Sequence, residues 1–310
     1  MTLLNVEAGL PSQVWAVVRL LTHLGQRVAV DEARALLSPP TLRMEESKSR
    51  PPFDAAVGSL LMLGLLREDN DLGGLALTGG AAALADGEDL AAYTAVLRSA
   101  VLDEERNSNL GADDSMTGPR DLTRALAWLL IHDPMEPAIN WANAQELLDS
   151  TDGEDRKIIR QEVLPLFPNP TRWTRLTHWA PALGFAAAPL LRAEGSGPLV
   201  PDCTVAVRQT VSALWPAGER VNAVEALRTL RERLPVLPGG AHSLALGFPS
   251  PGENVAGSAL SFALLRGHEE KWLRLEHDDD ARHILHLHDP DRPTSPRSVS
   301  DITILEDRRG

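Results

Sequence analysis

The stretch from Leu10 to Thr78 constrains the fold of this chain more than any other part of the sequence. Pro11 lies near the start of a predicted first helix, and Gly25 ends it. The apolar residues between them recur at helical spacing: Val14, Val17, Val18, Leu21 and Leu24. A short extended piece over 26–30 and a second helix over 31–37 are expected to follow.

A third helix is predicted from Phe53 to Leu65. Its expected core face carries the larger apolar residues Phe53, Val57, Leu60, Leu61 and Leu65. Its expected outer face carries Asp54, Ala55, Gly58, Ser59 and Met62. Residues 66–68 and 75–78 are then expected to form two short strands, because a turn rich in Asp, Asn and Gly separates them. Three helices followed by a hairpin is the order of a winged helix-turn-helix.

Duplex DNA binding through the third helix is one function of that fold. The charges argue against it, because the stretch holds seven Arg or Lys against eight Asp or Glu, and the third helix has no basic residue. Its small residues instead allow close approach of another helix or of backbone. We therefore favour a protein-docking or structural role over direct DNA binding, which stays open. The one phosphate contact expected in this stretch is the loop that carries Arg43, Lys48 and Arg50. In the alternative interpretation it is a solvated surface loop.

Composition excludes several classes of protein. The chain of 310 residues is 43% hydrophobic, enough for two or three domains, and its formal charge of -13 disfavours broad binding to nucleic acid or anionic membranes. Cys203 is the one cysteine, so no intrachain disulfide or zinc ribbon is expected, and a reducing cytoplasm suits the chain. We expect no signal peptide and no membrane contact, because no apolar run reaches the roughly 18 residues of a membrane span.

The predicted fold class is mainly α with small β wings, with tandem winged helix-turn-helix domains flanking a helical middle domain. The predicted segments are an N-terminal winged helix (1–80), a connecting helix and loop (81–119), the middle domain (120–200), a C-terminal winged-helix-like domain (201–290) and a tail (291–310). The middle domain is expected to hold four helices, the last two over 154–166 and 171–183. In the C-terminal domain, strands over 272–276 and 283–288 are expected to form a hairpin, and 234–255 an inserted loop. The tail is expected to be loosely ordered up to a short strand at 302–305.

The densest basic group lies in the middle domain and comprises Arg156, Lys157, Arg160, Arg172 and Arg175. If the helices that start near Glu154 and Thr171 pack side by side, these charges, with Trp173 and Trp179, would form a surface for nucleic acid or an anionic partner. In the alternative interpretation each arginine pairs with a nearby acid such as Glu154, Asp155 or Glu162.

Histidines near the C-terminus lie close to an acidic turn: His277, His283, His286 and His288 beside Asp278, Asp279 and Asp280. Their spacing is not that of a strong metal motif, so we expect a surface wing and no metal. The sequence has no GxxxxGK[ST], no GxGxxG after a strand and no GxSxG. We therefore expect no cofactor, no catalytic residue and no enzyme activity.

Several short segments resemble the DpdG-type proteins: 3–5 with 9–11, 177–185, 200–202, 234–240 and the closing helix and wing. Those proteins are encoded in bacterial clusters that insert 7-deazaguanine bases into DNA and restrict foreign DNA. The resemblance spans most of the chain, but its motifs are packing and turn motifs that carry over no catalytic residue. It implies an accessory role in a phage-defence complex.

Two functions therefore compete. In the first, the chain is a non-catalytic adaptor of a DNA-modification or restriction assembly, with other protein subunits as partners and double-stranded DNA as a further partner left open. In the second, it is a free-standing winged-helix DNA-binding transcription regulator. A third hypothesis, that the chain is a metal-dependent enzyme, rests on the C-terminal histidines alone. The lack of basic charge on the third helix favours the adaptor.

Overall fold

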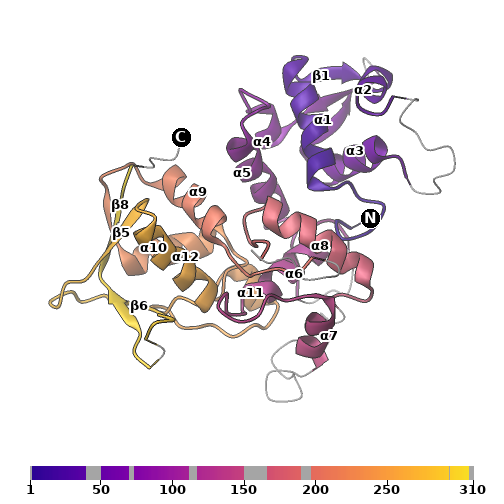
Figure 1. Cartoon of the computed structure of the whole chain (residues 1–310). Coiled ribbons are helices and arrows are strands. Elements are labelled where there is room, and N and C mark those ends of the chain that lie inside the picture. The colour runs from indigo at the N-terminus through magenta and orange to yellow at the C-terminus, as the bar shows by residue number, and fades with distance from the viewer. Residues whose placement is uncertain are drawn as a thin grey trace. The chain divides into compact units, whose positions relative to one another are not determined.

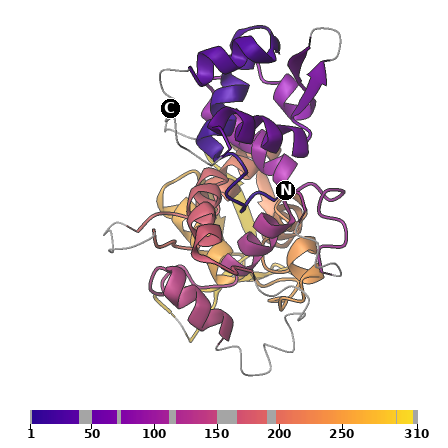
Figure 2. The same ribbon diagram turned by 90° about the vertical axis from the view of Figure 1, so that its right-hand side faces the viewer.

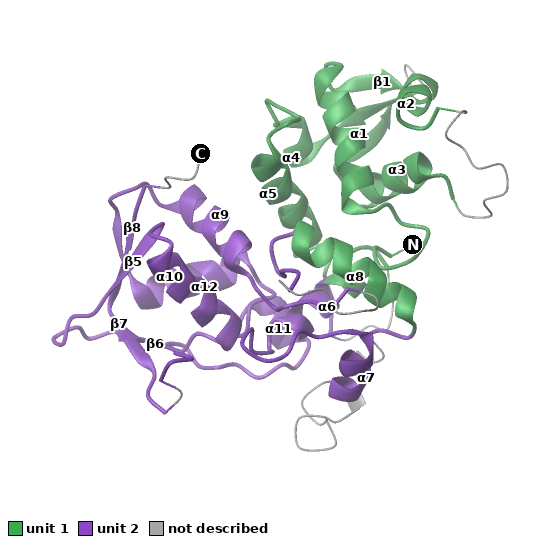
Figure 3. Ribbon diagram, in the orientation of Figure 1, with its two compact units in different colours: residues 1–107, 115–122, 169–182 green, residues 108–114, 123–168, 183–310 purple. Residues whose placement is uncertain are grey.

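The computed structural model of the chain describes residues 2–39, 50–69, 73–111, 117–149, 166–189, 197–292 and 294–306. Its helices and small antiparallel sheets (Figure 1 and Figure 2) confirm the predicted class, mainly α with small β elements. The chain forms two compact units (Figure 3). Unit 1 comprises 1–107, 115–122 and 169–182, and unit 2 comprises 108–114, 123–168 and 183–310.

Unit 1 opens with a module of three helices and three strands. These are α1 (Pro11–His23), β1 (Arg27–Ala29), α2 (Val30–Leu37), α3 (Pro52–Met62), β2 (Leu66–Asp69) and β3 (Gly74–Leu77). The strand order is β1-β3-β2, so β3 is the central strand and pairs antiparallel with both neighbours. The other helices of the unit are α4 (Gly79–Ala82), α5 (Leu90–Val101) and α8 (Pro170–Ala182).

The apolar spacing of α1 sets the core of this module. Val14, Val17, Val18 and Leu21 are buried as predicted, and α1 packs on α3. Leu24 was expected in the same core, but it follows the last turn of α1 and its side chain is 39% exposed. Gly25 adopts a φ of 83°, a left-handed conformation that glycine tolerates, and so turns the chain toward β1.

The predicted faces of α3 were partly wrong. Phe53 and Leu60 are buried, but Ala55 and Ser59, which were expected on the outer face, are buried too. Val57 and Leu61, expected in the core, are only half-buried. The reason is that a second part of the chain packs on the small residues of α3, as described below.

Unit 2 contains a second module with the same order of helices and strands. It consists of α9 (Thr204–Leu214), β4 (Arg220–Asn222), α10 (Ala223–Arg233), α12 (Ser258–Glu269), β5 (Leu273–Glu276) and β8 (Asp301–Ile304). Its strand order is β4-β8-β5, which is the connectivity of β1-β3-β2 in unit 1. The remaining elements are α6 (Arg120–Leu129), which begins in unit 1 and continues in unit 2, α7 (Trp141–Asp149), α11 (Ala241–Ala245), β6 (Leu285–Leu287) and β7 (Arg297–Val299).

Three expectations for the second half need correction. β5 pairs with β8 and β6 pairs with β7, so strands over 272–276 and 283–288 do not form one hairpin. The tail is not loosely ordered before its expected strand, because Arg297–Val299 form β7. The strand expected at 302–305 is present as β8, which is the central strand of its sheet and buries Ile302 and Ile304. Residues 234–255 are not a simple inserted loop, since they contain α11 and bury Val236 and Phe248.

The helices of the middle segment are distributed over both units. α8, predicted over 171–183, belongs to unit 1, whereas α7 belongs to unit 2. The helix predicted over 154–166 lies outside the described residues except for Leu166. In the part of the chain that the structure describes, we find no helix with both the length and the apolar character that crossing a membrane requires.

Candidate functional site

The small residues of α3 are covered by the N-terminal segment, residues 2–9, drawn in indigo between the N label and α1 (Figure 1). The backbone N–H of Gly9 donates to Ser59 Oγ at 2.9 Å and to the Ala55 carbonyl oxygen at 3.1 Å. A Cβ atom on Gly9 would lie 2.7 Å from the Cα of Ala56. The small residues of α3 therefore allow the close approach of a backbone. This is the packing role that the sequence indicated for them as the alternative to DNA binding.

This contact predicts the effect of a single methyl group. Gly9→Ala is expected to lower the free energy of unfolding by about 1–3 kcal/mol, because the added carbon meets backbone atoms that must shift. Urea denaturation followed by circular dichroism measures the change. Val6→Ala is the matched control, since Val6 is 60% exposed in the same segment. If the two variants unfold at the same urea concentration, the N-terminal segment does not pack tightly on α3.

Two arginines lie over the remaining surface of α3. Arg34 Nη2 is 3.2 Å from Asp54 Oδ1, and the Arg34 guanidinium carbon is 5.6 Å from the centre of the Phe53 ring. Arg50, one of the predicted phosphate contacts, places Nη1 2.9 Å from where a Cβ of Gly58 would be. α3 itself has no Lys or Arg. The positive charge on this surface therefore comes from Arg34, which pairs with Asp54, and from Arg50.

A buried carboxylate, Asp121 at the start of α6, anchors the N-terminal segment within unit 1. Its Oδ2 accepts a hydrogen bond from the backbone N–H of Leu4 at 2.9 Å and lies 3.4 Å from Arg172 Nη1 on α8. Its Oδ1 accepts a hydrogen bond from the backbone N–H of Leu122 at 2.8 Å. Burial raises the pKa of Asp121, and these hydrogen bonds and the Arg172 charge oppose that shift. Asp121 therefore holds the segment only while its partners compensate for the burial of its charge.

Arg175, one turn along α8 from Arg172, donates a hydrogen bond from Nη2 to the carbonyl oxygen of Ala8. Burial lowers the pKa of Arg175, and the nearby Asp121 charge opposes that shift. Trp173 and Trp179, which were expected beside a nucleic-acid surface, are fully buried. The residues of α8 that were predicted to bind an anionic partner thus face the interior of unit 1.

Of the predicted basic residues, three lie in the described part of the chain and five lie outside it. Arg172 and Arg175 come together with Asp121 around the N-terminal segment, and Arg50 lies apart from them against α3. The other five lie outside the described residues: Arg43, Lys48, Arg156, Lys157 and Arg160. A contact between those residues and nucleic acid remains a prediction. The pairing of Arg172 with an acid agrees with the alternative interpretation, although the acid is the distant Asp121.

The third helix of the second module, α12, is also covered. Ser261 Oγ accepts a hydrogen bond from the backbone N–H of His288 at 2.9 Å, and the His286 carbonyl accepts one from Ala256 at 3.0 Å. Arg266, the exposed arginine of α12, lies 2.9 Å from both Asp202 and Glu270. Sequence reasoning missed this cover, because it paired the strand around His286 with β5 instead of placing it beside α12.

The C-terminal histidines do not converge in the described structure. His277 Nε2 is 3.0 Å from Asp279 Oδ1, whereas His288 Nε2 is 3.2 Å from Asp133 Oδ2. The backbone of His286 forms hydrogen bonds with residues 254 and 256. In the described ranges no group of three His, Cys, Asp or Glu side chains has a geometry that would hold a metal ion.

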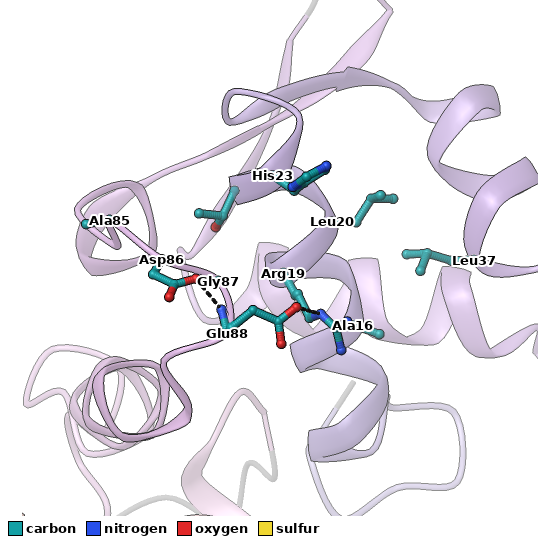
Figure 4. A pocket seen from close by; sticks show the side chains of 10 residues that line it. Ala16, Arg19, Leu20, His23, Leu37, Ala85, Asp86, Gly87 and Glu88 are labelled. Atoms are coloured by element: carbon teal, nitrogen blue, oxygen red, sulfur yellow. Dashed lines mark hydrogen bonds and ion pairs between the residues drawn. The ribbon is translucent and has the colours of Figure 1, made fainter. Parts of the chain in front are cut away.

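A hollow of about 690 Å³ lies on unit 1 between α1 and the loop 85–88 that precedes α5 (Figure 4). Arg19 Nε and Glu88 Oε1 form an exposed ion pair at 2.6 Å along it. Leu20 and Leu37 supply apolar surface. The hollow thus combines apolar side chains with one exposed ion pair.

Cys203 offers no nucleophile at a surface. The thiol is fully buried and donates to the Ala259 carbonyl oxygen at 3.4 Å. Burial raises its pKa, so the sulfur stays protonated at neutral pH.

These features define a mainly helical protein with two modules of the same element order, in which another part of the chain covers the third helix of each module. A model of the family described as DpdG-like matches residues 1–281, and the chain belongs to this family. The match confirms the resemblance seen in the sequence. Searches among curated proteins and among solved structures found no match.

Proposed function

We propose that the chain is a non-catalytic winged-helix subunit that docks other protein subunits of the Dpd 7-deazaguanine DNA-modification and restriction system. Membership of the DpdG-like family supports the assignment of the chain to this system. The chain would act in the cytoplasm, where the modified DNA is.

The element order supports two winged-helix modules. In each, a helix, a strand and two further helices precede the last two strands of the sheet, and the first strand pairs with the last. This is the order of a winged helix-turn-helix. In the second module α11 is inserted before the third helix, and β6 and β7 are inserted within the wing.

The observation that carries the adaptor role is the cover on α3. A winged helix that reads DNA presents the third helix to the major groove. Here the Gly9 backbone donates two hydrogen bonds to Ser59 and Ala55, and Leu3, Leu4 and Ala8 are buried with them. Exposing α3 would therefore disrupt the core of unit 1, and surfaces other than α3 remain for partners.

Co-expression with the other Dpd proteins tests this role. We expect the tagged chain to copurify with at least one of them at a fixed ratio, and the purified chain alone to hydrolyse neither ATP nor DNA. Absence of every Dpd protein from the eluate would reject the adaptor role. Activity of the purified chain that a point substitution abolished would reject its non-catalytic character.

A DNA contact, if the assembly makes one, is expected in the segment with Lys157 and Arg160. Because each lost phosphate contact reduces the salt slope of binding by about one unit, Lys157→Glu with Arg160→Glu should flatten the slope by about two on all DNA sequences alike. Fluorescence anisotropy with labelled duplex at several salt concentrations measures the slope.

Lys48→Glu with Arg50→Glu is the matched comparison and is expected to do less. If binding survived the change at Lys157 and Arg160 but collapsed with the change at Lys48 and Arg50, the first module would be the DNA reader. The transcription-regulator function would then be preferred.

A further inference from the structure

A histidine side chain closes one edge of the sheet in unit 2. β5 is an outer strand in the order β4-β8-β5 and pairs with β8 on one side. The carbonyl oxygen of Glu276 accepts a hydrogen bond from the backbone N–H of Ser300 on that side. Because successive residues of a strand point their backbone groups to opposite sides, Leu275 points away from β8. Its N–H donates to Nδ1 of His268 at 3.2 Å.

The turn between α12 and β5 places His268 at this edge. His268 lies in the last turn of α12, and α12 packs on β5. Between the two elements, Lys271 adopts a φ of 63°, a left-handed conformation that reverses the chain and brings β5 back along the helix. Gly64 adopts a φ of 66° at the corresponding turn between α3 and β2 in the first module. The two turns therefore have matching backbone conformations.

The histidine is particular to the second module. α3 ends at residue 62 and β2 begins at 66, and α12 ends at 269 and β5 begins at 273, so the two connections have the same length. By this correspondence His268 matches Leu61, and Leu275 matches Glu68 on the outer strand β2. A leucine side chain can neither accept a hydrogen bond nor take up a proton. The cap on the strand edge in unit 2 thus depends on a group that can change its charge.

The hydrogen bond defines the protonation state of the ring. Nδ1 can accept the Leu275 N–H only when it carries no proton, so the neutral ring holds its hydrogen on Nε2. Burial lowers the pKa of His268, and the positive charges of Arg297 and Arg274 lower it further, whereas Glu269 opposes them. The ring is therefore neutral at pH 7 and the hydrogen bond is in place.

We propose that His268 is a pH-sensitive cap on the outer edge of β5. A proton added to Nδ1 would face the Leu275 N–H, so the hydrogen bond would be lost and the strand edge would present an open donor. Open strand edges are templates for pairing with another strand. The unfolded chain binds this proton more readily than the folded chain. The stabilisation by the cap is therefore complete well above a pH of about 6.5, the ordinary pKa of histidine, and is lost as the pH falls through that value.

Amide hydrogen exchange of the full chain, followed residue by residue by NMR at about pH 7.5 and about pH 5, tests the cap. Rates are corrected for the intrinsic pH dependence of exchange. We expect the protection of the Leu275 amide to fall by at least about fivefold at the lower pH, because one hydrogen bond is lost. The Glu68 amide, at the matching position of the first module, is expected to keep its protection.

His268→Gln replaces the ring by an amide whose oxygen accepts a hydrogen bond but does not titrate, so it should abolish the pH dependence at Leu275. His283→Gln is the matched control, since His283 is exposed in the same unit, and should retain that dependence. The proposal is overturned if the Leu275 amide keeps its protection in the unaltered chain, or if both variants behave alike. An equal loss at the Ile304 amide, which donates to Glu219 from the central strand, would also overturn it, because the whole sheet would then open.

A measurement on the unaltered chain keeps the proposal testable if His268→Gln fails to fold. The ¹⁵N chemical shifts of a neutral imidazole distinguish the ring nitrogen that carries the hydrogen. We expect His268 to carry it on Nε2 at about pH 7.5. A hydrogen on Nδ1 at that pH would reject the cap, because Nδ1 could not then accept the Leu275 N–H.

Discussion

Asp121→Ala is expected to lower the free energy of unfolding of unit 1 by about 3–5 kcal/mol, the cost of removing one partner of a buried ionic cluster. The Asp121 side chain is fully buried, and the Arg172 side chain beside it is 16% exposed. Its loss leaves the backbone N–H of Leu4 without an acceptor and a largely buried guanidinium without a counter-charge. The N-terminal segment should then release α3.

Hydrogen exchange of α3 amides, measured by mass spectrometry, and urea denaturation check this effect. Asp121→Asn keeps an acceptor oxygen of the same shape and should cost less, about 1–3 kcal/mol. Asp103→Ala is the surface control, because it breaks a half-exposed pair with Arg106 and should cost about 1 kcal/mol or less. An effect of Asp121→Ala no larger than this control would show that the cluster does not anchor the segment.

Ile302→Ala is expected to destabilise unit 2 by about 2–5 kcal/mol, as large-to-small changes in a packed core do. Ile302 is 3% exposed on β8, where it lies opposite Val221 of β4 and Leu275 of β5. A cavity at the central strand therefore weakens both pairings of the sheet. Urea denaturation and hydrogen exchange of the β4 and β5 amides measure the change.

Val205→Ala, on the exposed side of α9, is the control and should change stability by no more than about 0.5 kcal/mol. The Val205 side chain is 53% exposed. Should Ile302→Ala behave like this control, the strand at 301–304 would not be the centre of the sheet. The predicted hairpin between 272–276 and 283–288 would then need to be reconsidered.

The elements of the first module could be predicted to within a few residues because their determinants are local. The spacing of Val14 to Leu21 defines the buried face of α1, and Gly25 supplies the left-handed residue that ends it. The turn rich in Asp, Asn and Gly likewise separates β2 from β3. In each case the residues that decide the structure lie within a few positions of the element that they form.

The pairings that the sequence could not show join distant residues. β8 inserts between β4 and β5, although it follows β5 by a long insertion that carries its own strands. The sequence therefore predicts the nearest alternating segment, at 283–288, as the partner of β5, whereas this segment pairs with β7. Hydropathy alternation identifies a strand, but it does not identify the strand's neighbour.

The basic residues of α8 show the same limit for the candidate site. Charge density alone indicated an anionic partner for Arg172 and Arg175, but their partners are Asp121 and the Ala8 carbonyl within the unit. One sequence feature predicted a contact that the structure contains. The small residues Ala55, Gly58 and Ser59 on α3 indicated close packing, and the Gly9 backbone packs on Ala55 and Ser59.

The anchoring of the N-terminal segment has a consequence for the order of events during synthesis. Leu4 precedes Asp121 by 117 residues, and Ala8 precedes Arg175 by 167 residues. Contacts between residues so far apart close late and slow folding. As the chain leaves the ribosome, the helices and strands of the first module emerge long before α8 does. Unit 1 therefore cannot complete its structure until more than half of the polypeptide has been translated.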